Sequence, residues 1–546
     1  MSITGPRIGR SGVAAWLLAI ATFGALAGVA IFLPESRLAV AFHDDAFYYF
    51  GVARNLAAGN GCTFDGIHPT NGFHPLWMVV LVPVFLLTGG DAAALRIALA
   101  IQLVLVATAA IALFRALAPR LGAGAMVAGL ALVTLPGSAF SVAGGLESSL
   151  VLLLLVWTWR KFERTAGAEE GGLAAWFAVG CLCLLGFLAR FEALVLAPAC
   201  ALLARRQLRK DPRRAAALLM PTVVGLLAYA IGNHLVFGTC LPVSALVKSE
   251  WAARIAPWEK AAKILNIPWP WAVLLDAAFA HSGWFPGPVV DALLRTALLA
   301  IALLAAWKFR RALNLAIRSA QAGYLLLVFA TWLALDLGSG LYIEPWNRVP
   351  MQLCAALLIG ALVAPHRKLA TTLCALLFLV SLTRLVWTAE TLGARRSSPA
   401  IYRYQAALWL RERTPEQTRI GSWNGGLLGF ASHRAVVNLD GLVNDRRYYR
   451  EVVVGGNLDS YLASEGITWI ADQMCGLTPS LDHYLARSGS GHLAPEFEVQ
   501  AVFANPDTPD QCPGYVVWRR RERPREGSFA PGIGEARIAQ ELLVGQ

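Results

Sequence analysis

Residues 12–33 read GVAAWLLAIATFGALAGVAIFL, and residues 42–50, a short distance further on, read FHDDAFYYF. The first stretch has about 22 apolar residues, which is enough for a helix to cross a hydrocarbon core of ~30 Å. A cleaved signal peptide usually has a shorter apolar core, so we expect a retained span that enters from the cytoplasm. The chain is therefore expected to begin with a membrane helix, with acidic and aromatic residues just beyond its outer end.

Further apolar runs follow this first span along most of the chain. They lie at about 75–90, 95–117, 123–141, 143–159, 172–189, 191–204, 215–236, 287–307, 319–338, 349–365 and 369–388. Membrane crossings counted forward from the first span and backward from the later basic loops disagree by one between residues 75 and 160. We therefore expect either that one run in this region is re-entrant or that two spans are merged. The sequence thus predicts a multispan α-helical membrane protein with about 11–13 transmembrane helices.

The composition of the 546-residue chain divides it into two parts. Hydrophobic residues make up 57% and charged residues 15%, which excludes a purely soluble protein because soluble domains are ~25% charged. Residues 1–394 hold 30 basic and 18 acidic residues, whereas residues 395–546 hold 17 of each. We therefore expect a membrane-embedded body over residues 1–394 and a separate external domain over residues 395–546.

The basic residues indicate how the chain is oriented in the membrane. They fall in short clusters between apolar runs, a pattern that favours topology signals on the cytoplasmic side over a nucleic-acid-binding face, so we expect no nucleic-acid partner. The clusters lie at residues 7–10, 205–214, 308–318 and 367–368. This orientation places residues 34–74, residues 237–286 and the C-terminal domain on the periplasmic side of a cytoplasmic membrane.

The external domain shows signals for both strands and helices. Strand-like runs lie at 419–423, 435–439, 467–471, 499–503 and 515–518, with helix-compatible segments at 401–412 and 458–464. These signals predict a small α/β domain, and its tail from about residue 519 is expected to be mobile. Cys475 and Cys512 could form a disulfide in an oxidising compartment, but the sequence leaves this open.

The first external region concentrates polar side chains that could do chemistry. Asp44 and Asp45 lie a few residues beyond the first span, where two uncompensated charges are expensive. One of them could take a proton from a hydroxyl group while its neighbour or a bound cation tunes its pKa. Alternatively, an aspartate could cap the helix expected over residues 46–56. The density of His, Asn, Asp and aromatic residues in the rest of the loop favours the functional interpretation.

Several motifs resemble those of one known superfamily. They are Asp44-Asp45, Tyr48-Tyr49, Gly59-Asn60-Gly61, residues 71–77 (NGFHPLW), 144–148 (GGLES), 188–192 (LARFE), 237–244 (FGTCLPVS), Lys248, and residues 438–444 (NLDGLVN). With the preceding span, these motifs resemble the multispan GT-C glycosyltransferases, which include protein O-mannosyltransferases, aminoarabinose transferases of lipid A and mycobacterial arabinofuranosyltransferases. The resemblance implies transfer of a single sugar from a polyprenyl-phosphate carrier to an acceptor on the outer side of the membrane.

The resemblance also implies roles for individual residues. Asp44 holds the position of the general base, and Asp45 is the alternative. Direct displacement would then invert the anomeric configuration, because no carboxylate nucleophile is required. A cation must stabilise the departing phosphate, and the candidates are Lys248, Arg190 and Arg348. Each of these could instead be a charge that reaches the membrane surface from a span end.

Other polar residues are candidate substrate contacts. His68, Asn71 and His74 could bind a phosphate or sugar hydroxyl groups, although two histidines in a loop do not define a metal site. Glu147 begins an apolar run that a charge would normally avoid. It could act on the substrate, pair with Arg190 or cap a helix.

The sequence leaves the cofactor, the acceptor and two alternative functions open. Some members of the superfamily use a divalent metal ion, which Asp44 or Asp45 with Glu147 could hold, but the sequence predicts no defined ligand set. The sugar is unidentified, and the acceptor could be a glycan, a lipid or a protein. A polytopic transporter or flippase of a lipid-linked sugar is the alternative function, as is a member that binds the donor without transferring the sugar. Transporters often contain similar repeated halves, which the sequence does not show.

Overall fold

The computed structural model describes most of the chain at the level of individual residues. The described residues are 33–88, 90–134, 144–167, 171–255, 323–339, 349–379, 399–474, 485, 491–504 and 514–521. The first apolar run, the part of the second external region beyond residue 255, Arg348, Cys475, Cys512 and the C-terminal tail lie outside them.

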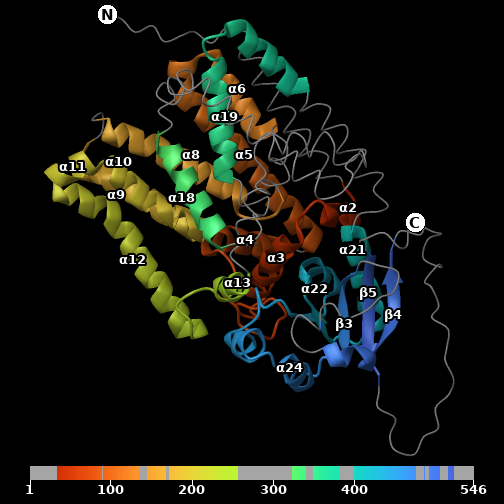
Figure 1. Cartoon of the computed structure of the whole chain (residues 1–546). Coiled ribbons are helices and arrows are strands. Elements are labelled where there is room, and N and C mark those ends of the chain that lie inside the picture. The colour runs from red at the N-terminus through yellow and green to blue at the C-terminus, as the bar shows by residue number, and fades with distance from the viewer. Residues whose placement is uncertain are drawn as a thin grey trace, which may run out of the picture.

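A bundle of helices forms the larger part of the molecule (Figure 1). Its main members are α5 (Asp91–Leu121), α6 (Ala123–Thr134), α8 (Ser148–Ala166), α9 (Leu173–Ala189), α10 (Leu196–Leu203), α12 (Pro212–Phe237), α18 (Gly323–Ser339) and α19 (Val349–Val363). They share one apolar core. Close contacts depend on small residues: a Cβ on Gly360 of α19 would lie 2.5 Å from the carbonyl oxygen of Gly124 in α6, a packing mode common between membrane helices.

Two helices in the described part of the chain, α5 and α12, are long and apolar enough to cross a membrane. Six shorter apolar helices of 10–17 residues accompany them. α12 leaves large apolar side chains exposed, including Ile231 and Leu235 at 58% and 77%, a surface suited to lipid. The run predicted at 75–90 forms the 13-residue α4 (Pro75–Leu87), which spans only about 20 Å.

The C-terminal domain contains a five-stranded mixed sheet, as the sequence predicted. Its strands are β1 (Arg419–Ser422), β2 (Ala435–Asn438), β3 (Trp469–Met474), β4 (Phe497–Phe503) and β5 (Gly514–Arg520), in the order β2-β1-β3-β5-β4. β1 pairs in parallel with β2 and β3, whereas β5 is antiparallel to β3 and β4. Helices α21 (Pro399–Arg413), α22 (Gly426–Ser432), α23 (Arg446–Tyr448) and α24 (Leu458–Ser464) accompany the sheet, with a π-helix (η3, Tyr449–Val454) after α23 and a 3₁₀ helix (η4, Gly491–Glu496) before β4. The carboxyl ends of β1, β2 and β3 therefore share one edge.

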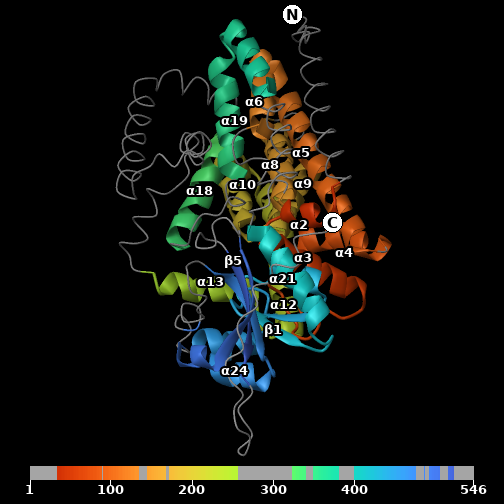
Figure 2. The same ribbon diagram turned by 90° about the vertical axis from the view of Figure 1, so that its right-hand side faces the viewer.

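The external loops lie between the helical bundle and the sheet. The first loop forms α2 (Glu35–Val40) and α3 (Asp44–Ala57), the second begins with α13 (Val243–Ala253), and short helices α11 (Arg205–Lys210) and η1 (Phe191–Val195) connect the bundle helices. Figures 1 and 2 both show the sheet beyond one end of the bundle, with α3 and α4 in between. The apolar side chains of α3 share a core with α4, α21, α22 and the sheet. This arrangement brings the first loop against the C-terminal domain.

Candidate functional site

The paired carboxylates predicted from the sequence begin α3, where the helical bundle meets the C-terminal domain. The Asp44 carboxylate lies 2.7 Å from a guanidinium nitrogen of Arg403 and accepts hydrogen bonds from the backbone N–H groups of Gly426 at 3.3 Å and Leu427 at 2.8 Å. The two amides are the first of α22, where unpaired N–H groups favour an anion. Asp44 thus connects α3 to α21 and α22, and we name this contact region the domain junction.

Tyr48, one turn after Asp44 on α3, extends the domain junction to the strand ends. Its hydroxyl accepts hydrogen bonds from the backbone N–H of Gly425 at 3.2 Å and the side-chain amide of Asn438 at 3.0 Å, and donates to the carbonyl of Trp423 at 3.3 Å. Asn438 ends β2, and Trp423 follows β1. Domains with parallel sheets commonly bind ligands at this edge, and here a side chain of the first loop occupies it.

Arg403 and Asp472 support the domain junction, and the sequence analysis overlooked both. Asp472 of β3 is fully buried and accepts hydrogen bonds from the backbone N–H groups of Trp423 at 2.6 Å and Asn424 at 3.1 Å, which fixes the turn after β1. Arg403 is 7% exposed and lies over the ring of Tyr515. An acid directly after the strand-like run predicted at 467–471 could have pointed to Asp472, whereas Arg403 resembles any basic residue of an amphipathic helix.

Asp440, just beyond β2, brings a third carboxyl group near the paired aspartates. It accepts a hydrogen bond from the backbone N–H of Leu442 at 2.8 Å. Burial, and to a smaller extent the charge of Asp45, raises the pKa of Asp440 well above its usual value. Asp45 is therefore close enough to Asp440, just beyond the end of β2, for their charges to interact.

Two glycines allow the first loop to approach the C-terminal domain closely. A Cβ on Gly426 would lie 2.1 Å from the carbonyl oxygen of Asp44, and a Cβ on Gly72 would lie 1.9 Å from that of Leu442. A side chain at either position would push the two parts of the chain apart. Gly72 belongs to the motif at residues 71–77, so this close approach gives a physical reason for that glycine.

A second cluster of charges lies on the side of α3 that faces the helical bundle. The buried carboxylate of Glu147 pairs with Arg190 at 2.5 Å and lies 3.3 Å from Nδ1 of His74. The same nitrogen of His74 lies 2.6 Å from the hydroxyl of Tyr49. Arg190 also reaches Glu192 at 3.2 Å. The structure thus joins three predicted site residues in one buried network, and it shows the predicted pairing of Glu147 with Arg190.

The loop that carries Glu147 is fixed by buried hydrogen bonds. Gln102 of α5 donates to the carbonyl of Leu146 at 2.6 Å and accepts from the N–H of Gly145 at 3.0 Å. The indole of Trp77 donates to the carbonyl of Gly145 at 3.0 Å. Gly145 has a φ of 94°, and a Cβ there would lie 2.4 Å from that of Ala46 in α3. A glycine is therefore required for this loop to pack on α3.

Asn71 and Lys248 occupy different positions around the first loop. Asn71 is buried, accepts a hydrogen bond from the N–H of Val243 at 2.8 Å and donates to Asn233 at 3.1 Å, so its polar atoms hold the two external loops together. Lys248 is exposed on α13 and is close enough to Glu192 for their charges to interact. Because Glu192 pairs with Arg190, Lys248 lies near the buried network that contains Arg190.

His68 belongs to a network separate from that of His74, although the sequence grouped the two. Its Nδ1 lies 2.6 Å from Asp65, and its Nε2 lies 3.2 Å from Glu465 of the C-terminal domain. Glu465 also pairs with Arg419 at 2.6 Å and with Arg447 at 2.8 Å. His68 thus contributes a second contact between the first loop and the external domain.

Tyr48→Phe should destabilise the domain junction. It removes the acceptor of two donors, the N–H of Gly425 and the amide of Asn438, and an unsatisfied buried donor costs about 1–3 kcal/mol. We expect a lower melting temperature of the purified protein in detergent. Tyr404→Phe on α21 is the matched control, because the described part of the structure shows no hydrogen bond of its hydroxyl group. Equal melting temperatures for the two variants would contradict the assigned role of Tyr48.

The contact of His68 predicts a dependence of stability on pH. Burial lowers the pKa of His68, but Asp65, Asp445 and Glu465 outweigh this and raise it above its ordinary value. The resulting stabilisation is fully present below the unfolded-state pKa of ~6.5 and is lost as pH rises through the folded-state pKa. We expect the melting temperature to fall as pH rises above about 6.5, the unfolded-state pKa, and His68→Gln to remove that part of the fall. Identical pH profiles for variant and wild type would show that His68 makes no such contribution.

The sequence left open whether Asp44 or Asp45 with Glu147 holds a divalent metal ion. Within the described ranges, no group of three or more His, Cys, Asp or Glu side chains is arranged to hold a metal ion. Asp44 is engaged by Arg403, and Glu147 by Arg190, so each of these two carboxylates faces a cationic side chain. Among the described residues, Asp44 and Glu147 therefore do not fit a shared metal site.

Comparisons with known proteins agree with this architecture. A family model described as a domain of unknown function (DUF8728) matches residues 396–518, the external domain. No curated protein matches the sequence significantly.

Solved structures resemble the chain over most of its length. The oligosaccharyltransferase of Archaeoglobus fulgidus, in complex with Zn and sulfate, has a TM-score of 0.51 and 14% identity, covering 92% of this chain and 72% of that one. Its apo form has a TM-score of 0.48 and 13% identity, covering 92% and 74%. ArnT from Cupriavidus metallidurans bound to undecaprenyl phosphate has a TM-score of 0.40 and 18% identity, covering 91% and 98%.

The likeness to the archaeal enzyme extends over both the helical bundle and the external domain, because it covers 92% of the chain. At 14% identity, it is a likeness of fold. The chain therefore shares the fold of this archaeal oligosaccharyltransferase, and the motifs around Asp44 and Asp45 had led us to expect a fold of that kind.

Proposed function

We propose that this protein is a membrane glycosyltransferase that moves one sugar from a polyprenyl-phosphate carrier to an acceptor hydroxyl on the outer side of the cytoplasmic membrane. The observation that carries this proposal is the position of Asp44 and Asp45. On a fold shared with an oligosaccharyltransferase, both begin a helix held between the helical bundle and the external domain. The two helices of spanning length and the six shorter apolar helices among the described residues support a membrane-embedded bundle. We propose about 11–13 spans and a periplasmic C-terminal domain on the basis of the sequence.

The aspartate pair supplies the general base for the acceptor hydroxyl. Arg403 and the amides of α22 fix the orientation of Asp44. Asp45 is the next residue, and it is close enough to Asp440 for their charges to interact. The attacking oxygen displaces the phosphate from the anomeric carbon as the proton passes to the carboxylate. This direct displacement inverts the anomeric configuration.

Cationic side chains on the bundle side of α3 stabilise the departing phosphate. Lys248 is exposed and contacts it directly, whereas Arg190 is buried and held by Glu147 and Glu192. His74 orients this network through Glu147. Arg348 has the same proposed role on the basis of the sequence alone.

The remaining predicted contacts, Asn71 and His68, hold loops in place and support substrate binding indirectly. The acceptor, a glycan, lipid or protein, approaches the aspartates from the side of the external domain. Membrane lipid surrounds the apolar helices and the carrier tail.

The experiment is sugar release from a panel of radiolabelled polyprenyl-phosphate monosaccharides by the purified full-length protein in detergent, with membrane extract as acceptor. We expect turnover of one donor and lower turnover by Lys248→Ala. Lys210→Ala, which removes a lysine from the predicted cytoplasmic face, is the matched control with unchanged turnover. Transbilayer movement of the donor in liposomes without release of sugar would overturn the proposal and favour a flippase.

A further inference from the structure

A pocket of about 430 Å³ opens at the edge of the sheet opposite to the domain junction. Its position follows from strand direction. Arg419 begins β1 and Trp469 begins β3, while Arg519 lies near the end of β5, which runs antiparallel to β3. These residues line the pocket at the amino ends of β1 and β3, whereas Asp44 and Tyr48 meet the carboxyl ends. The pocket is therefore separate from the proposed catalytic site.

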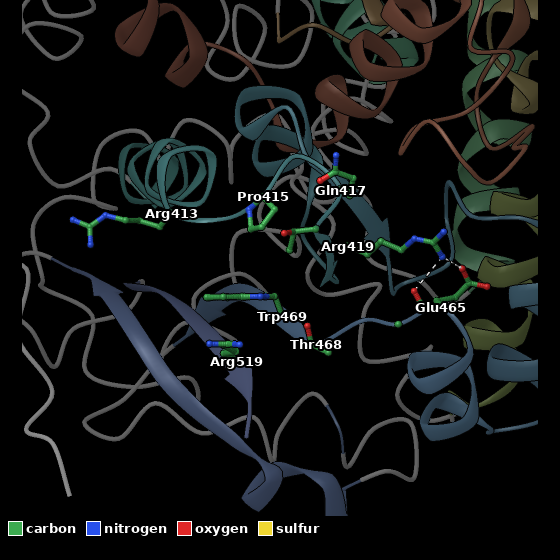
Figure 3. A pocket seen from close by; sticks show the side chains of 10 residues that line it. Arg413, Pro415, Gln417, Arg419, Glu465, Thr468, Trp469 and Arg519 are labelled. Carbon is green, nitrogen blue, oxygen red and sulfur yellow. Dashed lines mark hydrogen bonds and ion pairs between the residues drawn. The ribbon is translucent and has the colours of Figure 1, made fainter. Parts of the chain in front are cut away.

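The pocket lining has a net positive charge. Its residues include the basic Arg413, Arg419 and Arg519 and one acidic residue, Glu465. Figure 3 shows Trp469 and Arg519 one below the other on one side, and Arg419 with Glu465 on the other side. Guanidinium groups bind carboxylate and phosphate oxygens through paired N–H donors. The charge thus selects an anionic ligand.

The other lining residues suit a sugar. Trp469 is half-buried, and the guanidinium carbon of Arg519 lies 5.5 Å from its ring centroid, so the indole is held in a fixed orientation beside a cation. Gln417, Thr418 and Thr468 add side chains that both donate and accept hydrogen bonds. An aromatic surface with such neighbours can pack on a pyranose ring and bond its hydroxyl groups.

We propose that this pocket binds the acidic group of a saccharide, a carboxylate or a phosphate ester, with the sugar ring against Trp469. This inference rests on the proposed function, in which the bound saccharide is part of the acceptor. The pocket then restricts the acceptor to an acidic glycan.

Glu465 connects the pocket to the first loop. Its Oε2 lies 2.6 Å from Arg419 in the pocket wall and 3.2 Å from Nε2 of His68. An acidic ligand that approaches Arg419 competes with Glu465 for the guanidinium group. A ligand bound in the pocket therefore affects the contact between Glu465 and His68. This contact holds the first loop just before the motif at residues 71–77.

The test is calorimetric titration of the full-length protein in detergent with galacturonic acid trimer, neutral galactose trimer and inorganic phosphate. We expect the acidic trimer to bind at least about tenfold more tightly than either other probe. Arg413→Gln and Arg519→Gln should each weaken binding of the acidic trimer several-fold. Arg521→Gln removes an exposed arginine outside the pocket lining and should leave binding unchanged.

Equal binding of acidic and neutral trimers would overturn the proposal, and so would equal losses in Arg413→Gln and Arg521→Gln. Binding of inorganic phosphate as tight as that of the trimer would show a simple anion site and would also overturn it. Because Arg413 is exposed at the end of α21, Arg413→Gln keeps the test valid if Arg519→Gln fails to fold. The titration contains no donor, so failure here leaves the donor-turnover result of the proposed function unaffected.

Discussion

Arg190→Met is expected to destabilise the protein by about 3–5 kcal/mol, because it leaves a buried carboxylate without its cationic partner. The side chains of Arg190 and Glu147 are only 4% and 1% exposed. His74 lies 3.3 Å from Glu147 and offers a weaker replacement. The measurement is thermal unfolding of the purified protein in detergent, in which the melting temperature should fall by several degrees.

A more exposed ion pair of the same chain provides the comparison. Arg120 lies 3.2 Å from Glu163, and the two side chains are 35% and 15% exposed, so Arg120→Met should cost less than Arg190→Met. The double variant Glu147→Gln/Arg190→Met should recover part of the loss, because it removes both charges together. Equal small effects of Arg190→Met and Arg120→Met would contradict the importance assigned to the buried network.

Asp45→Asn is expected to lower sugar transfer by about 10²- to 10⁴-fold, the range that general acid–base catalysis contributes. Asp44→Asn is expected to lower transfer as well and, in addition, to destabilise the protein by about 2 kcal/mol. The additional loss arises because an amide would replace the charged acceptor of Arg403 and of two backbone N–H groups. Initial rates of sugar release and melting temperatures on the same preparations separate the two effects.

Arg403→Gln is the matched control for Asp44→Asn. It keeps both aspartates and weakens only the attachment of Asp44 to α21, so it measures how much activity depends on the domain junction alone. A smaller loss of transfer than in either aspartate variant is expected. Full transfer by Asp45→Asn would assign the base to Asp44, and full transfer by both aspartate variants would exclude the pair from catalysis.

The strands of the external domain could be predicted from the sequence because each is a short apolar run bounded by turn residues. The five runs correspond to β1–β5, with boundaries shifted by up to three residues. The bundle helices followed in the same way from continuous apolar runs. The number of membrane crossings did not follow, because hydropathy does not distinguish the 13-residue α4 from a full span.

The site was predictable where several polar residues are close in sequence and not where they meet only through the fold. Asp44 and Asp45 were found because two adjacent acids follow an apolar run. Arg403 and Asp472 are distant from them in sequence, and only the docking of α3 on the external domain brings them together. For the same reason, the sequence could not show that His68 contacts Glu465 while Asn71 holds the two loops together.

Donor turnover by the double variant Asp44→Asn/Asp45→Asn, with donor binding measured on the same samples, tests the central claim most directly. The wild type is expected to release sugar from one polyprenyl-phosphate donor. The double variant should still bind that donor through Lys248 and the apolar helices but release no sugar above background. Equal release by wild type and double variant would show that the aspartates at the domain junction do not perform the transfer.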